Sequence, residues 1–156
     1  MIHIARTLPE HTEYVAAHLR QGDIDEMTRA GLTDPAAVVR ESVEVSTFAF
    51  TALHDGVPMC LFGLRPDGIL SRRARVWLLG TPEINTAKKD FVKTCKIAVA
   101  GLLDIYPVLY NAVDAQYPQA HRLLTFLGAE FIKKATSPNG NPFILFEIRR
   151  KKNVYR

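Results

Sequence analysis

The spacing of apolar residues changes several times along the chain, and each change predicts a new element. Residues 2–6 alternate as a short strand, and helical spacing follows over 10–19, 24–32 and 35–45. Pro9 and Asp34-Pro35 are typical helix starts, because proline fits the first turn and an aspartate caps its free N–H groups. The beginning of the chain therefore predicts one strand followed by two or three short helices.

Strand periodicity then continues from residue 47 to residue 80. Three alternating segments cover 47–53, 57–64 and 74–80, and they are separated by Asp55-Gly56 and by a turn at 66–68. Asp-Gly between two alternating segments is a strong hairpin signal, since both residues tolerate a positive φ. We expect these segments to pair as antiparallel strands.

A long helix is predicted next, because apolar residues recur at steps of three and four from Ala87 to Leu103. It starts at Thr81-Pro82 or at Asn85-Thr86, and Pro107 ends it. The segment 108–114 is largely apolar, as in a strand that is buried on both faces. A helix brings the chain back to the sheet before this strand, so we expect parallel pairing.

The remaining pattern predicts a helix over 118–127 that ends at Gly128, and a hairpin with strands over 131–135 and 143–149. The predicted order is β-α-α-β-β-β-α-β-α-β-β. This is an α/β fold with a mixed sheet, of the α+β kind, and helices on both faces. A chain of 156 residues is long enough for one such domain and too short for two ordinary ones.

Charge is distributed unevenly along the chain. The formal net charge is +4, yet the segment from Arg149 to Arg156 carries five bases and no acid, so the remainder is near neutral. We therefore expect a domain over 1–148 and a basic C-terminal tail over 149–156, which is either a solvated terminus or a contact for nucleic acid. No signal peptide and no membrane-spanning run is visible.

The sequence contains few of the usual signatures of catalytic or metal sites. Cys60 and Cys95 lie among apolar neighbours and are expected to be free thiols. The five histidines show no shared metal spacing, and we expect no metal site. No Ser or Cys nucleophile motif and no phosphate-binding P-loop is present.

The predicted element order resembles that of the GNAT acetyltransferase fold over nearly the whole chain. The Asp55-Gly56 hairpin lies where the family has a turn, and Ala120, Leu123 and Gly128 match its late-helix pattern N-x-x-A-x-x-L-Y-x-x-x-G-F. A narrower resemblance is to the acetyltransferase-like internal virion proteins of short-tailed phages. It rests on chain length, a Lys-rich long helix and three short segments: Val76-Trp77-Leu78, residues 126–131 and residues 144–146.

The GNAT resemblance implies that acetyl-CoA pyrophosphate binds at the start of the long helix through a Q/R-x-x-G-x-G/A loop. In this chain Asn85 stands at the position of Arg or Gln, and Thr86 and Lys88 stand at the glycines. Side chains at the glycine positions are expected to crowd a pyrophosphate. If cofactor binding is retained, the resemblance implies a site made of Leu79, Gly80, Asn85, Thr86 and Lys88.

The family also implies a tyrosine that protonates the leaving thiolate, and Leu124 stands at its position here. Tyr117 is the alternative proton donor, although an aromatic residue at a helix start is often a packing residue. A base on the central strands could be Asp114 or Glu83. Asp114 has the alternative interpretation of a strand-end carboxylate.

These observations favour a phage virion or assembly-associated protein with an acetyltransferase-like fold and a degenerate, non-catalytic site without cofactor. Its expected partners are other virion proteins, further copies of itself or packaged DNA bound through the tail, and its expected location is the virion or the host cytoplasm. The alternative is an acetyl-CoA-dependent N-acetyltransferase. Nucleic-acid binding through the tail is compatible with the first interpretation.

Overall fold

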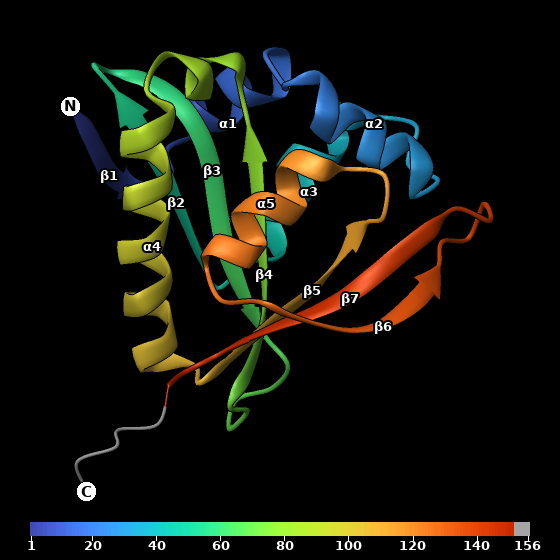
Figure 1. Cartoon of the computed structure of the whole chain (residues 1–156). Coiled ribbons are helices and arrows are strands. Elements are labelled where there is room, and N and C mark those ends of the chain that lie inside the picture. Colours follow the sequence, from blue (N-terminus) through green and yellow to red (C-terminus); the bar gives the residue numbers. More distant parts are fainter. Residues whose placement is uncertain (152–156) are drawn as a thin grey trace, which may run out of the picture.

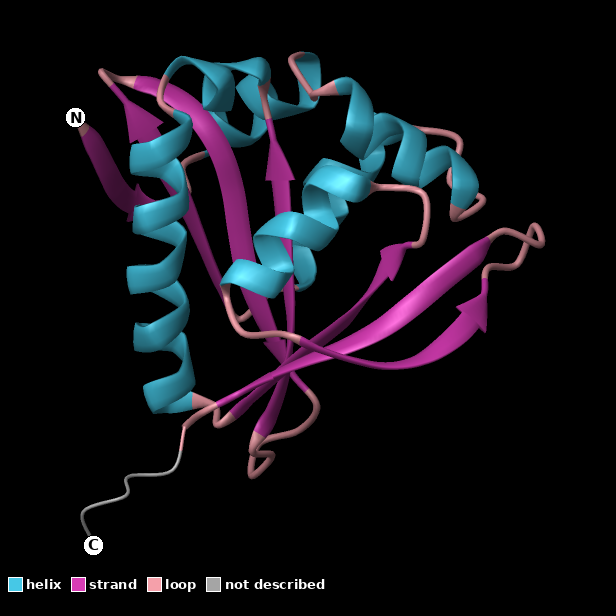
Figure 2. Cartoon of the chain, viewed as in Figure 1, coloured by secondary structure: helices cyan, strands magenta, loops and turns pink. Residues whose placement is uncertain are grey.

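Across residues 1–151, which the computed structural model describes, the chain forms a seven-stranded mixed sheet with helices on both faces (Figures 1 and 2). The elements in chain order are β1 (Ile2–Arg6), α1 (Pro9–Ala17), α2 (Gln21–Arg29), α3 (Pro35–Val45), β2 (Phe48–His54), β3 (Val57–Pro66), β4 (Arg73–Gly80), the 3₁₀ helix η1 (Pro82–Thr86), α4 (Lys88–Ile105), β5 (Val108–Asp114), α5 (Pro118–Phe126), β6 (Glu130–Thr136) and β7 (Pro142–Arg149). The predicted fold class is confirmed.

The structure differs from the predicted element order in two details. Three helices follow the first strand, one more than the predicted order contains. The long helix α4 begins at Lys88, later than either predicted start, because residues Pro82–Thr86 form the tighter η1 turn first. The Thr81 hydroxyl caps η1 by accepting the N–H of Glu83 at 3.3 Å.

The sheet has the order β1-β2-β3-β4-β5-β7-β6. All neighbouring strands pair antiparallel except β4 and β5, which are parallel as predicted. The β2–β3 turn has φ of 49° at Asp55 and 85° at Gly56, which fits the predicted hairpin. Gly128 has φ of 88° two residues after the end of α5, as expected of a helix C-terminus.

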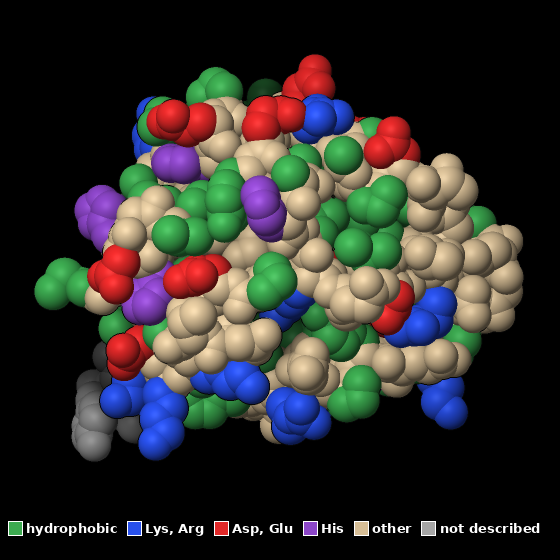
Figure 3. Space-filling model, turned by 90° about the horizontal axis from the view of Figure 1, so that it is seen from above, with side chains coloured by type: hydrophobic (Ala, Val, Ile, Leu, Met, Phe, Trp, Pro, Cys, Tyr) green, Lys and Arg blue, Asp and Glu red, His purple; other side chains and the backbone are tan. Residues whose placement is uncertain are grey.

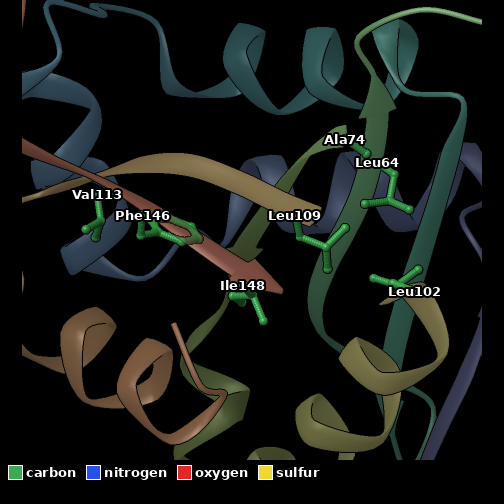
Figure 4. Close-up of a cluster of buried hydrophobic side chains, with 7 residues drawn as sticks. All are labelled: Leu64, Ala74, Leu102, Leu109, Val113, Phe146 and Ile148. Carbon is green, nitrogen blue, oxygen red and sulfur yellow. The ribbon is translucent and has the colours of Figure 1, made fainter. Parts of the chain in front are cut away.

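The apolar core lies on both faces of the sheet. Under α4 and α5 it is formed by seven side chains that converge from the strands and from α4 (Figure 4): Leu64, Ala74, Leu102, Leu109, Val113, Phe146 and Ile148. The other face packs Leu61 against Val15 of α1 and Val39 of α3. Cys60 and Cys95 are free thiols, as predicted, and burial raises the pKa of Cys60.

The pairing of β4 with β5 is short, and this positions the site. Only Arg73 to Arg75 pair with Val108 to Tyr110, after which the two strands diverge toward their carboxyl ends (Figure 1). The Asn111 side chain donates a hydrogen bond of 2.8 Å to the Val76 carbonyl at the start of the resulting gap. Helix α5 lies in front of the gap in this view.

The first bases of the predicted tail are attached to the domain. Arg149 is the last residue of β7 and pairs with Glu147. The guanidinium of Arg150 donates to the carbonyls of Leu103 and Asp104 at 2.8 and 2.7 Å, and so satisfies acceptors that the end of α4 leaves free. Residues 152–156 of the predicted tail lie outside the described residues. In the described part no helix is both long and apolar enough to cross a membrane.

Candidate functional site

The backbone of Leu78 faces the gap between β4 and β5. At Gly80 the N–H donates to Asp23 and the carbonyl accepts from the N–H of Arg20, so both groups point away from β3. Backbone groups two residues apart in a strand point in the same direction, so the N–H and carbonyl of Leu78 also point away from β3, toward β5. Because β5 pairs with β4 only as far as Arg75, these two groups have no strand partner there.

Two cavities meet at this gap. The larger has a volume of about 480 Å³ and lies between α2, β4, β5 and α5. The smaller has about 120 Å³, lies between α4, α5 and the sheet, and is almost entirely apolar. Both are lined by the same residues of β4, α5 and β7, which are Val76, Trp77, Leu78, Leu123, Leu124 and Phe146. Ligands entering from the two sides could therefore contact each other at Leu78.

Asp23 joins three elements in the lining of the larger cavity. It is 2% exposed and accepts three hydrogen bonds, from Arg20 Nε at 2.9 Å, the Gly80 N–H at 2.6 Å and the Tyr117 hydroxyl at 2.8 Å. Burial, together with the Asp23 charge, raises the pKa of Tyr117. The hydroxyl of Tyr117 thus lines the cavity as a proton donor that is already engaged with Asp23.

Asp114, the predicted base on β5, is fully buried in an ion pair. One carboxylate oxygen contacts Nε of Arg29, and the other accepts the N–H of Gln116 at 2.9 Å. Glu83, the other predicted base, lies on η1 beside His54, with 3.1 Å between Oε1 and Nδ1. The structure therefore places Asp114 beside the larger cavity and Glu83 at a separate location.

Glu26 of α2 is a carboxylate of the larger cavity that the sequence did not indicate. Its Oε2 accepts the backbone N–H of Asp114 at 2.9 Å, and Oε1 has no hydrogen bond among residues 1–151. Burial raises the pKa of Glu26 from its usual 4.5 to about 7, helped by the charges of Asp23 and Asp114 and opposed by the Asp114 N–H. A signal was present, since Asp23 and Glu26 share one face of a helix at a spacing of three.

The predicted cofactor residues gather around the turn from β4 to α4. Asn85, Thr86 and Lys88 are exposed, and the Thr86 hydroxyl donates to the Glu83 carbonyl at 2.7 Å. Ala87 precedes α4 without a capping side chain, and the first helical bond runs from the Phe91 N–H to the Ala87 carbonyl. The N–H groups of residues 88–90 therefore lack helical acceptors.

Leu79 lines the larger cavity, whereas the N–H of Gly80 is already bound to Asp23. Leu124 lines both cavities and offers no proton at the position of the family's acid. Figure 3 shows the molecule from above, where hydrophobic side chains are exposed near the centre and several Lys and Arg side chains line one margin. Among residues 1–151, no group of three His, Cys, Asp or Glu side chains is placed to hold a metal ion.

No protein-family model matches the chain, and no curated protein matches it. Several solved structures do match the chain. A GNAT-family acetyltransferase from Bacillus anthracis has a TM-score of 0.69 at 9% identity, covering 95% of this chain and 94% of that one. A spermidine N-acetyltransferase SpeG chimera from Vibrio cholerae and hSSAT has a TM-score of 0.72 at 13% identity, with 95% of each chain covered.

AAC(6')-Ib in complex with ribostamycin and coenzyme A has a TM-score of 0.71 at 16% identity, covering 96% of this chain and 93% of that one. At such identities the likeness concerns the fold, and the chain has the fold of GNAT acetyltransferases. The narrower resemblance to phage virion proteins has no counterpart in these findings and stays a prediction.

Proposed function

We propose that the protein is an N-acyltransferase that uses an acyl-CoA donor, acetyl-CoA in the simplest case. The observation that carries this proposal is the Leu78 backbone, whose N–H and carbonyl face a gap where two cavities meet. A thioester placed there would have an N–H donor for its carbonyl oxygen, and an amine could approach from the opposite side. This reverses the preference for a non-catalytic protein that the sequence suggested.

The donor fits the residues of the smaller cavity and the start of α4. The apolar cavity between α4 and α5 suits the pantetheine arm, and the free N–H groups at the start of α4 suit the phosphates. The exposed Lys88 and Lys89 add positive charge at that end. The Thr86 hydroxyl already donates to the Glu83 carbonyl, so we assign the phosphates to the backbone N–H groups of residues 88–90.

The fold neighbours support the same assignment. One of them is named a spermidine N-acetyltransferase, and another contains coenzyme A together with ribostamycin. Both descriptions concern those proteins, and the transfer to this chain is our proposal. In the larger cavity the acceptor would meet Asp23, Glu26 and Tyr117, while Leu124 leaves the departing thiolate without the family's tyrosine.

Calorimetric titration with acetyl-CoA tests the proposal. We expect binding, and an increase in stability of about 2.7 kcal/mol when acetyl-CoA is present at 100 times its dissociation constant. Thr86→Glu should weaken binding, since a carboxylate there opposes the pyrophosphate. Ala100→Glu is the matched control, because it adds the same charge on the exposed side of α4 about 18 Å farther along the helix. No binding at millimolar acetyl-CoA would contradict the proposal.

A role in phage virion assembly is the second candidate, and one surface favours it. Strand β6 is at the edge of the sheet and exposes the side chains of Phe131 and Ile132 by 40% and 50%. An edge strand that exposes such side chains can pair with a strand from another protein or another copy. Mass spectrometry of purified particles, with a deletion mutant alongside, tests this role. Normal particles without the protein would argue against it.

A further inference from the structure

The charges that line the larger cavity do not balance. Arg20 and Asp23 neutralise each other across a 2.9 Å contact, whereas Glu26 forms no ion pair among residues 1–151. Beside the cavity, Asp114 is neutralised by Arg29. One uncompensated negative charge therefore remains, on Glu26, and a single positive charge on a ligand would complement it.

Glu26 is also oriented for proton transfer. The hydrogen bond from the Asp114 N–H holds Oε2 at 2.9 Å, which fixes the carboxylate while leaving Oε1 without a partner. The other carboxylates nearby are occupied, because Asp23 accepts three hydrogen bonds and both oxygens of Asp114 are bonded. Among the described residues around the cavity, Glu26 has the carboxylate oxygen that is free to accept a proton.

We infer that Glu26 is the catalytic base of this site, taking a proton from an acceptor that is a primary monoamine with an apolar body. The inference rests on the proposed acyl transfer. The apolar body is indicated by the cavity walls, because Met27, Leu32, Val38, Trp77 and Leu79 line the same cavity as Glu26. A polycation would need several carboxylates to balance its charge, and among the described residues that line the cavity only Glu26 is without an ion-pair partner.

The ammonium group of the acceptor loses one proton to Oε1 of Glu26, and its nitrogen then attacks the thioester carbonyl carbon. A C–N bond forms, the C–S bond breaks, and the second proton of the nitrogen passes to the departing sulfur, giving an amide and the CoA thiol. Glu26 returns its proton to solvent. The Leu78 N–H stabilises the oxyanion that forms between these steps.

The pKa of Glu26 suits this role, since a base works best when its pKa lies near the working pH. Burial raises this pKa, as do the charges of Asp23 and Asp114, whereas the Asp114 N–H and the charge of Arg20 lower it. The other titratable groups around it bond to these two acids: Arg29 and His121 contact Asp114, and Tyr117 contacts Asp23.

Steady-state kinetics on the 156-residue chain tests the base, with phenethylamine as acceptor and acetyl-CoA as donor. We expect kcat/KM of the native protein to rise between about pH 6 and pH 8. Glu26→Gln should lower kcat about 100-fold or more and abolish this inflection, while the Kd for acetyl-CoA stays unchanged by calorimetry. The matched control is Asp25→Asn on the same helix, which removes the same charge outside the cavity lining and should leave kinetics unchanged.

The assignment of the base would be overturned if Glu26→Gln kept the pH profile of the native protein and a kcat within a few-fold of it.

Comparison of phenethylamine and tryptamine with spermidine tests the acceptor class, and we expect kcat/KM to be at least about tenfold higher for the two aromatic amines. A preference for spermidine, or acetyl-CoA binding without transfer to either aromatic amine, would overturn the assignment of the acceptor class. Absence of acetyl-CoA binding would instead count against the proposed function itself.

Discussion

The hydroxyl of Tyr117 donates a hydrogen bond of 2.8 Å to Oδ1 of Asp23, although the two residues are 94 positions apart. This contact joins the start of α5 to α2, and Asp23 in turn holds the Gly80 N–H at the end of β4. The wall of the larger cavity therefore depends on a side-chain network that connects three separate elements. Replacing members of this network should affect stability before it affects chemistry.

Tyr117→Phe should lower the free energy of unfolding by about 1–3 kcal/mol, because it leaves a buried oxygen of Asp23 without its partner. Urea denaturation measures the change. Tyr110→Phe is the control, since the Tyr110 hydroxyl bonds to Asp67 at the surface, and its loss should cost about 0.5 kcal/mol or less. A large loss of turnover with unchanged stability would instead support the catalytic role that the sequence suggested for Tyr117.

Gly22→Ala should destabilise the protein by about 1–3 kcal/mol, because a Cβ there would lie 2.6 Å from the Tyr117 ring. Gly101→Ala provides the opposite case. Gly101 lies in α4 with no side chain or distant backbone within 4 Å of an added Cβ, so alanine should stabilise the helix by about 0.5–1 kcal/mol. Thermal denaturation of both variants compares the two effects. Equal and small changes would show that α2 can move away from Tyr117.

Glu26→Gln should make the protein more stable at high pH and leave it little changed at low pH. The folded protein raises the pKa of Glu26 to about 7, so between about pH 4.5 and 7 it keeps a proton that the unfolded chain releases. Stability from this group is thus present below pH 4.5 and is lost as pH rises through 7. Glutamine resembles the protonated form and lacks this dependence.

The expected gain for Glu26→Gln at pH 8 is about 1–3 kcal/mol over the native protein, shrinking toward zero near pH 4.5. Urea denaturation across this pH range measures it. A gain that does not depend on pH would place its origin in packing rather than in protonation of the carboxylate. Stabilisation on removing a charged side chain is common where a residue serves function rather than stability.

Truncation of the basic tail should separate nucleic-acid binding from folding. If the tail binds DNA, ending the chain after Lys151 removes two bases and should reduce the slope of log K against log salt by about 2. Ending it after Ile148 also removes Arg150 from the end of α4, so this shorter chain should unfold at a lower temperature. Fluorescence anisotropy with duplex DNA and thermal denaturation measure the two effects. An unchanged salt slope would rule out binding through residues 152–156.

The fold followed from the sequence to a large extent, because periodicity reports which faces of an element are buried. Alternation over 47–80 and helical spacing from Ala87 to Leu103 described the sheet and α4, and Asp55-Gly56 and Gly128 marked turns that require a positive φ. The start of α4 was placed too early. The apolar spacing is compatible with both a 3₁₀ turn and an α-helix, and the choice depends on packing of Ile84 against the core.

The candidate site could be predicted from the sequence only in part. Asp114, Tyr117 and Leu79 were singled out by their positions in the chain, and the structure brings all three to the larger cavity or its edge. Glu26 was missed because its spacing of three from Asp23 does not by itself show that this face of α2 is turned toward a cavity. Its backbone contact with Asp114 spans 88 positions, and it exists only because α2 packs against the end of β5.

By itself, the sequence determined the elements, their order and the parallel return of β5, since these depend on local spacing and on a helical connection between two strands. The tertiary structure alone decided that β5 leaves β4 after Arg75, that the Leu78 backbone faces the gap, and that Glu26 keeps a free oxygen there. The reason is physical: a carboxylate's pKa and partners depend on burial and on charges brought close by folding. Residues far apart in sequence supply both the burial and the nearby charges.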